Sequence, residues 1–545
     1  MPTSVRSAQW IWTPIVGWVL LSGNTSAVLA QTNEVPPAVQ GIGPQTGAPM
    51  VGPAVGATGS GATATGATTD GTAPTGGDVK PAVTTNFPAS PTTVLPAVTP
   101  QAGTGSSAAG INGNLLTGGT GGTNTNEVTS LPSYSTTIVN APFGASIPVE
   151  QPIGGTGAAT SSEELGISVG TFRLYPQIET NVGFDSNVFA QNASLGTVGS
   201  VYTTIAPTLD LRSDWSNHAL HILAGGIAGF YGSAQTQNYR NYTLQADGKI
   251  DIQTDFFLTW SAAFKQNTEA LGTPNVAFAQ APTVVDSVPV SLSLSQRFNR
   301  VSYQLRAAMT RYTFYDNSTI LVNGLPASSR DRTEYEQSLR IGYDINDDVT
   351  LFVQPGLNQR RYLNPVNSVD QDRDSNGQLV SVGATWSTSS STKLEATVGY
   401  QNQAYQTLGG ATSAFTFGLT GTWNGYAPLI LRPSIQRAIS ETALTTYKNY
   451  VSTTYALDFN YLIHDAWTAV GGISLITADY TPIDGSGAAP RTDSIYRGQI
   501  GLLYALRPQI QIGPFFEYTS GMSTDPTTGP GYDREIFSVR LIAKR

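Results

Sequence analysis

Histidine is rare in this chain, and its three copies are the first residues to test for metal or acid/base chemistry. They are His218, His221 and His464. His218 and His221 are three residues apart, and on a strand that spacing puts side chains on opposite faces. We therefore do not expect them to share a metal ion. All three are expected at turns or strand ends.

A pair of carboxylates, Glu334 and Glu336, is the other candidate for acid/base chemistry. Both share one strand face with Arg332 and Arg340, which is typical of a row of solvated charges rather than of a catalytic couple. No G-x-S-x-G, H-E-x-x-H or P-loop pattern occurs. We therefore expect no enzyme and no cofactor, with a hydrolase built on the same fold as the alternative.

Composition narrows the choice further. The chain has no Cys, which excludes disulfides, thiolate metal sites, a Cys nucleophile and a lipid-modified cysteine. Only 12% of its residues are charged, where about a quarter is usual for a soluble domain. Neutral polar residues, Gly and Tyr take their place, as is typical of lumens, turns and membrane boundaries.

The first thirty residues have the pattern of a signal peptide. Arg6 supplies a positive charge, residues 10–21 supply a short apolar core, and small residues follow it. Cleavage between Ala30 and Gln31 fits this pattern. An uncleaved membrane anchor is the alternative, but the apolar run falls short of the ~20 residues that a span needs. We expect the mature protein to leave the cytoplasm.

The segment 31–165 is rich in Gly, Ala, Thr and Pro. It cannot bury enough apolar surface to offset the entropy of ordering, so we expect a disordered periplasmic tail. Its seven acidic residues and one lysine account for six of the nine net negative charges of the chain. The acidic balance therefore says little about the remaining part.

From residue 166 to 545 a period of two recurs. In "YTLQADGKIDI" the apolar residues Leu244, Ile250 and Ile252 alternate with Asp247, Lys249 and Asp251. We count about eighteen such segments, with sixteen as the alternative, and most are long enough to cross a bilayer as tilted strands. They are 171–183, 200–212, 218–231, 240–252, 255–266, 287–299, 301–315, 331–345, 348–362, 376–388, 391–403, 412–424, 428–438, 446–462, 465–479, 493–506, 508–520 and 534–544.

Connections between these segments alternate in length. Tight ones are expected at 214–217, 253–255, 298–300, 346–348 and His464, and long polar ones at 184–199, 267–286, 316–330, 363–375, 480–492 and 521–533. Short periplasmic turns and long outer loops are typical of a transmembrane antiparallel β-barrel, with both termini in the periplasm. The sequence therefore predicts an all-β barrel over 166–545 whose apolar face meets lipid.

The polar parity of these segments gives the residues expected to face the lumen. They are Asp247, Lys249, Asp251, Glu334, Glu336, Arg340, Gln354, Arg360, Lys393 and Glu395. Proline interrupts the pattern, because it lacks the N–H that a sheet ladder needs. We expect some strand prolines to lie at bulges or strand ends; they are Pro176, Pro207, Pro355, Pro433 and Pro514.

Three stretches resemble a known family. They are "GFDSNVF" at 183–189, "APTLDLRSDWSNHAL" at 206–220 and "FKQNTEALGTP" at 264–274. They are similar to the putative beta-barrel porin family of Gram-negative envelopes, which is often linked to exopolysaccharide gene clusters. The resemblance implies an outer-membrane barrel and a role in polysaccharide export, and it carries no catalytic or ligand residues.

Three functions stay open at this point. The first is a diffusion channel for small solutes or saccharides, because about eighteen strands enclose a lumen wide enough for water. The second is an accessory barrel for exopolysaccharide export, and the third is a structural or adhesive surface barrel. The expected partners are outer-membrane lipid, the barrel-assembly machinery, and polysaccharide or periplasmic export proteins; no nucleic-acid partner is expected.

Overall fold

A computed structural model describes residues 166–269, 271–273, 282–315, 327–363, 372–388, 392–426, 428–525 and 529–545. The predicted signal peptide and tail lie outside these residues. No helix in the described part is long and apolar enough to span a bilayer.

The described chain is built almost wholly from strands. Three short 3-10 helices, η1 (Ala193–Leu195), η2 (Gln235–Gln237) and η3 (Ala327–Arg330), lie in connections between them. The strands are β1 (Ile167–Val169), β2 (Phe172–Asp185), β3 (Ser200–Ser213), β4 (Ala219–Tyr231), β5 (Tyr239–Gln253), β6 (Phe256–Glu269), β7 (Thr283–Phe298), β8 (Val301–Tyr315), β9 (Arg332–Asp344), β10 (Val349–Tyr362), β11 (Ser375–Ser387), β12 (Lys393–Tyr405), β13 (Ala411–Tyr426), β14 (Leu429–Ser440), β15 (Tyr447–His464), β16 (Trp467–Pro482), β17 (Arg491–Arg507), β18 (Ile510–Ser523) and β19 (Tyr532–Lys544).

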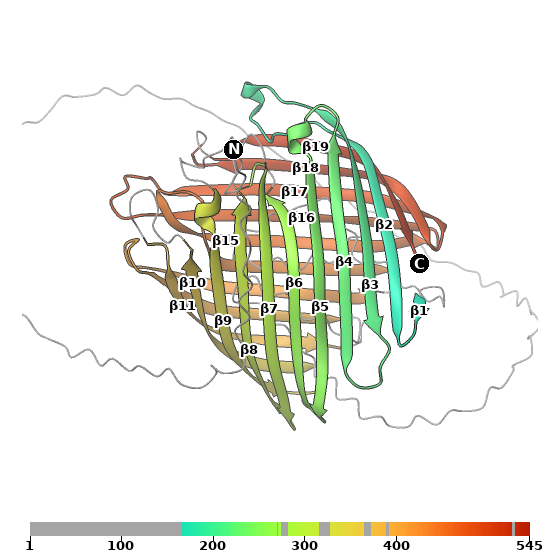
Figure 1. Ribbon diagram of the computed structural model, residues 1–545, viewed down its shortest axis with the longest axis vertical. Helices are drawn as coiled ribbons and strands as arrows, with labels where there is room; N and C mark the ends of the chain where they lie inside the picture. The colour runs from blue at the N-terminus through green and yellow to red at the C-terminus, as the bar shows by residue number, and fades with distance from the viewer. Residues whose placement is uncertain are drawn as a thin grey trace, which may run out of the picture. The chain divides into compact units, whose positions relative to one another are not determined.

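Strands β2 to β19 form a closed antiparallel barrel of eighteen strands. Each pairs with its neighbours in the sequence, and β19 pairs with β2 to close the ring. The short β1 pairs only with the start of β2 in an N-terminal hairpin. Figure 1 shows β2 to β9 side by side across the near wall and the later strands, orange to red, crossing behind them. The predicted fold and strand number are confirmed, and sixteen strands is excluded.

Strand boundaries differ from the predicted ones by a few residues. The largest extension is at β7, which begins at Thr283 rather than at 287. Its ladder to β6 runs to Glu269↔Thr283, beyond the part of the sequence that alternates well. Backbone pairing continues there without a strict apolar and polar alternation, because pairing depends on the neighbouring strand and not on side-chain type alone.

The five strand prolines lie inside their strands and at no register shift, so the expectation that some would lie at bulges or strand ends is wrong. Pro355 keeps its register with Val380 on β11, while the β9 ladder skips it and resumes at Gly356↔Ser338 in the same register. Pro514 likewise pairs with β19 and interrupts only the β17 ladder. A missing N–H costs pairing on one side only, so the strand continues with its parity intact.

Candidate functional site

Burial alternates along the strands and separates an exposed apolar face from a buried polar face. On β10, Leu351 and Leu357 are 46% and 54% exposed, whereas Gln354 and Asn358 are each 3% exposed. The same division holds around the ring, and Phe415 on β13 reaches 71%. Exposed large apolar side chains occur on sixteen of the eighteen barrel strands, all except β6 and β14, and such a surface around a closed barrel is typical of contact with lipid.

The ten residues predicted to face the lumen lie on the more buried face of their strands or at its margin. The buried ones are Asp247, Glu334, Arg340, Gln354, Arg360 and Glu395. Those of intermediate exposure are Lys249, Asp251, Glu336 and Lys393. Their role in conduction stays a prediction.

The structure pairs these charges differently from the expected single row. Arg332 does contact Glu334, with 2.8 Å between Nε and Oε1. Arg340, however, crosses from β9 to β12 and forms two hydrogen bonds of 3.0 and 2.9 Å with Glu395. Its guanidinium lies 3.3 Å from the ring centroid of Phe352 on the way. The inner face is therefore crosslinked between strands that are not neighbours.

One segment separates from β13 and lies over the inner face of the wall, while its two ends stay paired with β15 and β16. It comprises the end of β14, the following loop and the start of β15, residues 438–449, and we call it the inner tip. The outermost pair of the β13–β14 ladder is Phe417↔Arg437. Two residues later, the Ile439 amide donates to Gln401 Oε1 on β12 at 3.3 Å. The inner tip thus lies over the inner face of the wall, and residues 438–444 are all buried.

Glu441 anchors the inner tip. Arg360 on β10 donates to Glu441 Oε1 at 2.5 Å and to the Ile439 carbonyl at 2.8 Å. The hydroxyl of Tyr362 donates to Glu441 Oε2 at 2.6 Å, and that of Tyr405 donates to Oε1 at 3.1 Å. Both carboxylate oxygens are thus hydrogen-bonded to strands of the wall, which satisfies a buried charge.

Further contacts hold the rest of the inner tip. Arg373 donates to the Thr442 carbonyl at 2.9 Å, and Lys448 donates to the Gly409 carbonyl at 2.9 Å. Asn449 Nδ2 donates to Thr412 Oγ1 at 2.8 Å. The partners lie in the β10–β11 connection, in the β12–β13 connection and on β13, so the inner tip is fixed along its length.

Electrostatics favour the charged form of Glu441, which lies in the loop outside the strands. Burial alone would raise the pKa of its carboxyl group, but the positive charges of Arg360, Arg373 and Arg332 outweigh burial. They hold the pKa below the usual value for a glutamate. The carboxylate is therefore ionised at neutral pH.

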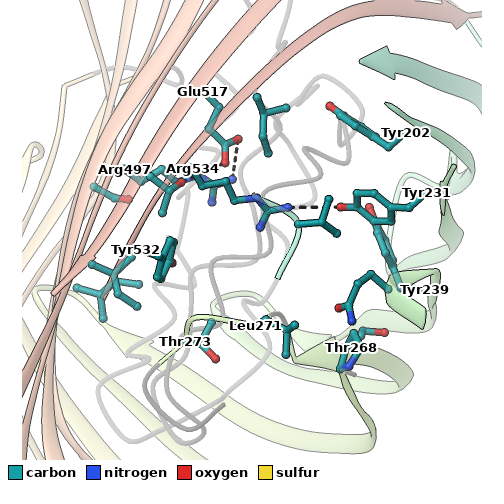
Figure 2. Close-up of a pocket in the computed structure, with 18 residues that line it drawn as sticks. Tyr202, Tyr231, Tyr239, Thr268, Leu271, Thr273, Arg497, Glu517, Tyr532 and Arg534 are labelled. Carbon is teal, nitrogen blue, oxygen red and sulfur yellow. Dashed lines mark hydrogen bonds and ion pairs between the residues drawn. The ribbon is translucent and has the colours of Figure 1, made fainter. Parts of the chain in front are cut away.

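A cavity of about 110 Å³ lies inside the barrel (Figure 2), and no residue of the inner tip lines it. Its walls come from β3 to β6 and from β16 to β19, with residues of the outer connections. Four tyrosines line it: Tyr202, Tyr231, Tyr239 and Tyr532. The rings of Tyr202 and Tyr231 are paired across β3 and β4, with centroids 5.8 Å apart. Aromatic and polar groups therefore converge on one space.

Two ion pairs border this cavity. Arg497 on β17 contacts Glu517 on β18 with 2.9 Å between Nη2 and Oε2. Arg534 on β19 donates through Nε to both oxygens of Asp185 at 3.0 and 3.1 Å. It also reaches the Tyr231 hydroxyl at 3.4 Å, and Figure 2 shows this contact across the cavity.

Sequence reasoning missed Glu441 and the cavity tyrosines. Tyr202 lies on the same strand face as the buried polar residues Thr204 and Thr208. An aromatic residue on a polar face is therefore the sequence pattern that indicates this site. For the inner tip the signal was weaker. Ala443 and Leu444 make the connection partly apolar, but other connections also contain apolar residues, and nothing local shows what this one contacts.

Two of the three histidines lie where they were expected, at a turn and at a strand end. His218 has a φ of 62° in the turn before β4, and His464 is the last residue of β15. His221 instead lies on the inner face, 3.1 Å from both Asp210 and Asp247. Among the residues that the structure describes, no group of three or more His, Cys, Asp or Glu side chains could hold a metal ion.

Solved barrels that are similar to this chain include two with low sequence identity. OpdO of Pseudomonas aeruginosa is 12% identical with a TM-score of 0.37, over 70% of this chain and 98% of that one. The siderophore receptor PirA of Pseudomonas aeruginosa is 10% identical with a TM-score of 0.34, over 68% and 80%. These likenesses are too weak to support an inference about function. No curated protein sequence matches the chain.

A family model gives a clearer result. The model described as "Putative beta-barrel porin 2" matches residues 161–545, which include every strand of the barrel. This agrees with the closed ring, its exposed apolar face and its crosslinked polar interior. The chain belongs to the putative beta-barrel porin 2 family.

Proposed function

We propose that the protein is an outer-membrane channel for small hydrophilic solutes. The observation that carries this proposal is the division of the eighteen strands into an exposed apolar face and a buried face of paired charges and amides. Such a barrel is stable in a bilayer and offers solutes a polar path through it. Family membership supports the same function.

The path we propose runs along the cavity side of the interior. The inner tip occupies the opposite side, where Glu441 ties it to Arg360 and two tyrosines. The cavity is open enough to hold several water molecules, since roughly 10–15 Å³ of such space holds one. Solutes would pass between the cavity walls and the inner tip.

Liposome swelling tests this function. Full-length protein in liposomes should admit arabinose and glucose faster than sucrose and raffinose, because a narrowed lumen sorts neutral solutes by size. Swelling no faster than in protein-free liposomes, with a barrel that still resists unfolding by detergent at room temperature, would show that the barrel does not conduct.

We also propose that the short turns face the periplasm and the longer connections face outward. A tag inserted at Gly485, in the connection after β16, should bind antibody on intact cells. A tag at Asp347, in the turn between β9 and β10, should bind only after the outer membrane is permeabilised. The reverse pattern would invert the orientation.

A further inference from the structure

Three residues form a row across β8, β9 and β10, near the end of the barrel that carries the longer connections. They are Arg311, Thr333 and Arg361, which we call the arginine row, and the ladders pair Thr333 with both arginines. The three strands lie side by side in Figure 1. Because neighbouring strands are about 4.8 Å apart, the two arginine backbones are roughly 10 Å apart, and their long side chains can reach one ligand from two sides.

The arginine row faces away from the lumen. Arg311 has the same strand parity as Leu305, and Arg361 has the same parity as Leu357; both leucines are more than half exposed. Arg311 is itself exposed, and the side chain of Arg361 is 34% exposed. The row thus lies between the apolar face of the wall and the outer connections, at the level where lipid headgroups meet a membrane barrel.

Arg311 has hydrogen-bond donors to offer a ligand. Within the part of the chain that the structure describes, its side chain has no hydrogen bond and no ion pair. The acidic neighbour on the same face, Asp286 on β7, instead accepts from Gln266 Nε2 at 2.9 Å and from the Tyr315 hydroxyl at 2.7 Å. A guanidinium carries five N–H donors in a planar fork that matches the oxygens of a phosphate group.

Arg361 contributes charge rather than free donors. It donates to the Ser375 carbonyl at 3.1 Å and to Asn376 Oδ1 at 2.7 Å, and these bonds hold its guanidinium on the outer face. Its acidic neighbour Asp374 is 3.9 Å away, measured between Nε and Oδ2. The arginine row therefore has two positive charges and one loosely placed counter-charge, which favours an anionic group beside it.

Two exposed amides, Gln359 and Gln337, lie below the arginine row, toward the middle of the wall. Gln359 pairs with Tyr335, and Gln337 pairs with Leu357, in the β9–β10 ladder. Neither amide has a hydrogen-bond partner among the described residues. An amide both donates and accepts, and leaving it unpaired in hydrocarbon costs free energy. A lipid that covers this face should therefore supply polar groups below its headgroup.

We propose that the arginine row binds a phosphate of a phosphorylated glycolipid of the lipid A type in the outer leaflet. Arg311 and the Thr333 hydroxyl donate to the phosphate, and Arg361 adds positive charge. The acyl chains of such a lipid carry amide and hydroxyl groups near the headgroup, which suit both the donors and the acceptors of Gln337 and Gln359. Below its phosphate, a glycerophospholipid offers only ester carbonyls, which accept and do not donate.

The charge of the rim favours one position for this lipid. On β19, Asp533 and Glu535 lie at the same end of the barrel and have the parity of Phe537, which is 55% exposed. Both acidic side chains are exposed and would repel a phosphate. The site is therefore local to β8, β9 and β10 and is not a continuous band around the barrel.

Native mass spectrometry of the full chain in detergent can count the bound lipids. Bisphosphorylated lipid A is the probe, phosphatidylglycerol is the anionic phospholipid for comparison, and inorganic phosphate is the free anion. Lipid A should bind at least about tenfold more tightly than phosphatidylglycerol, and millimolar inorganic phosphate should not displace it. Equal binding of phosphatidylglycerol, or displacement by inorganic phosphate, would overturn the assignment to a glycolipid.

Substitution of Arg311 tests the site with little effect on folding, because its side chain bonds to no other described residue. Arg311→Gln should weaken lipid A binding about fivefold to tenfold, whereas Arg311→Lys keeps the charge, loses the fork and should weaken it about twofold to threefold. The matched control is Arg437→Gln. Arg437 lies on β14 toward the same end of the barrel, donates to Thr453 Oγ1 and is 3.9 Å from Asp479. Lipid A binding should stay within about twofold in this control.

The site and the channel can fail separately. Unchanged lipid A binding in Arg311→Gln, or an equal loss in Arg311→Gln and Arg437→Gln, would overturn the site whatever the liposome swelling shows. Absence of swelling with the expected lipid A binding would overturn the channel alone. The choice of leaflet rests on the orientation proposed above, so an inverted tag pattern would overturn the outer-leaflet partner even if lipid A binds in detergent.

Discussion

Arginine is paired with a carboxylate on both sides of the barrel interior, but the pairing has a different effect on each side. On one side, Glu441 accepts hydrogen bonds from Arg360, Tyr362 and Tyr405, and the inner tip is drawn onto the wall. On the other, Arg497 and Glu517 join neighbouring strands and leave a cavity between the walls. Where one partner of such a pair lies on a loop, as Glu441 does, the pair holds that loop inside the lumen. Where both partners lie on neighbouring strands, as Arg497 and Glu517 do, the pair is part of the lumen wall.

Burial separates the two sides energetically. The side chains of Arg360 and Glu441 are 1% and 2% exposed, whereas those of Arg497 and Glu517 are 11% and 17% exposed. Removing one partner of a fully buried pair leaves an unpaired charge that water cannot reach. Beside a cavity, water can replace the lost partner. Equivalent substitutions should therefore have unequal effects.

The largest expected effect compares Glu441→Ala with Glu517→Ala. The first should lower the free energy of unfolding by about 3–5 kcal/mol, because it leaves buried arginine side chains without their carboxylate partner. The second should lower the free energy of unfolding by about 1–3 kcal/mol, because it removes hydrogen bonds to a charged group and water partly replaces those bonds. Urea unfolding in lipid vesicles measures both. Equal losses of unfolding free energy would show that the ion pairs on the two sides do not differ in how burial affects them.

The pH response should differ as well. Because the folded-state pKa of Glu441 is depressed, its stabilisation is complete above the usual glutamate value of about 4.3 and is lost as pH falls through the lower folded value. We expect conductance to rise as the inner tip loosens in acid. Single-channel recordings from pH 7 to pH 3 should show this rise in the wild type and not in Glu441→Gln, which lacks the titrating group. A rise of the same size in both proteins would exclude Glu441 as its cause.

A disulfide across the inner tip should have the smallest effect at neutral pH. Thr412→Cys with Asn449→Cys replaces a hydrogen-bonded pair, and the chain contains no other cysteine. Oxidation should leave neutral conductance nearly unchanged and abolish the rise in acid, because it fixes the position that the inner tip already occupies. Reduction with dithiothreitol is the control. A large fall in conductance at pH 7 on oxidation would mean that the inner tip is mobile there.

Strand parity explains why the barrel could be predicted from the sequence. Residues such as Leu244 and Asp247 fall on opposite faces because side chains alternate along a strand, and that rule needs no knowledge of neighbours. The ring follows from the strand count and from the alternation of connections. The expectation of bulges at prolines was wrong, but it did not affect the predicted faces. At Pro355 the backbone loses pairing with one neighbouring strand and keeps its register with the other.

Long-range contacts explain what could not be predicted. Arg360 and Glu441 are 81 residues apart, and Arg340 and Glu395 are 55 apart. Parity assigns each of the strand residues to a face but does not say which partner it meets across the interior. The inner tip is the clearest case, because a loop that folds inward obeys no strand period.

Thiol accessibility tests the central claim that solutes pass on the cavity side. Single cysteines would replace Thr519 in the cavity wall, Asn358 on the side of the inner tip and Val398 on the exposed face, in a chain with no native cysteine. A charged, water-soluble methanethiosulfonate reagent would be added during planar-bilayer recording. We predict that the current falls for Thr519→Cys and is unchanged for Asn358→Cys and Val398→Cys. An unchanged current for Thr519→Cys, or a fall for Asn358→Cys instead, would contradict the account.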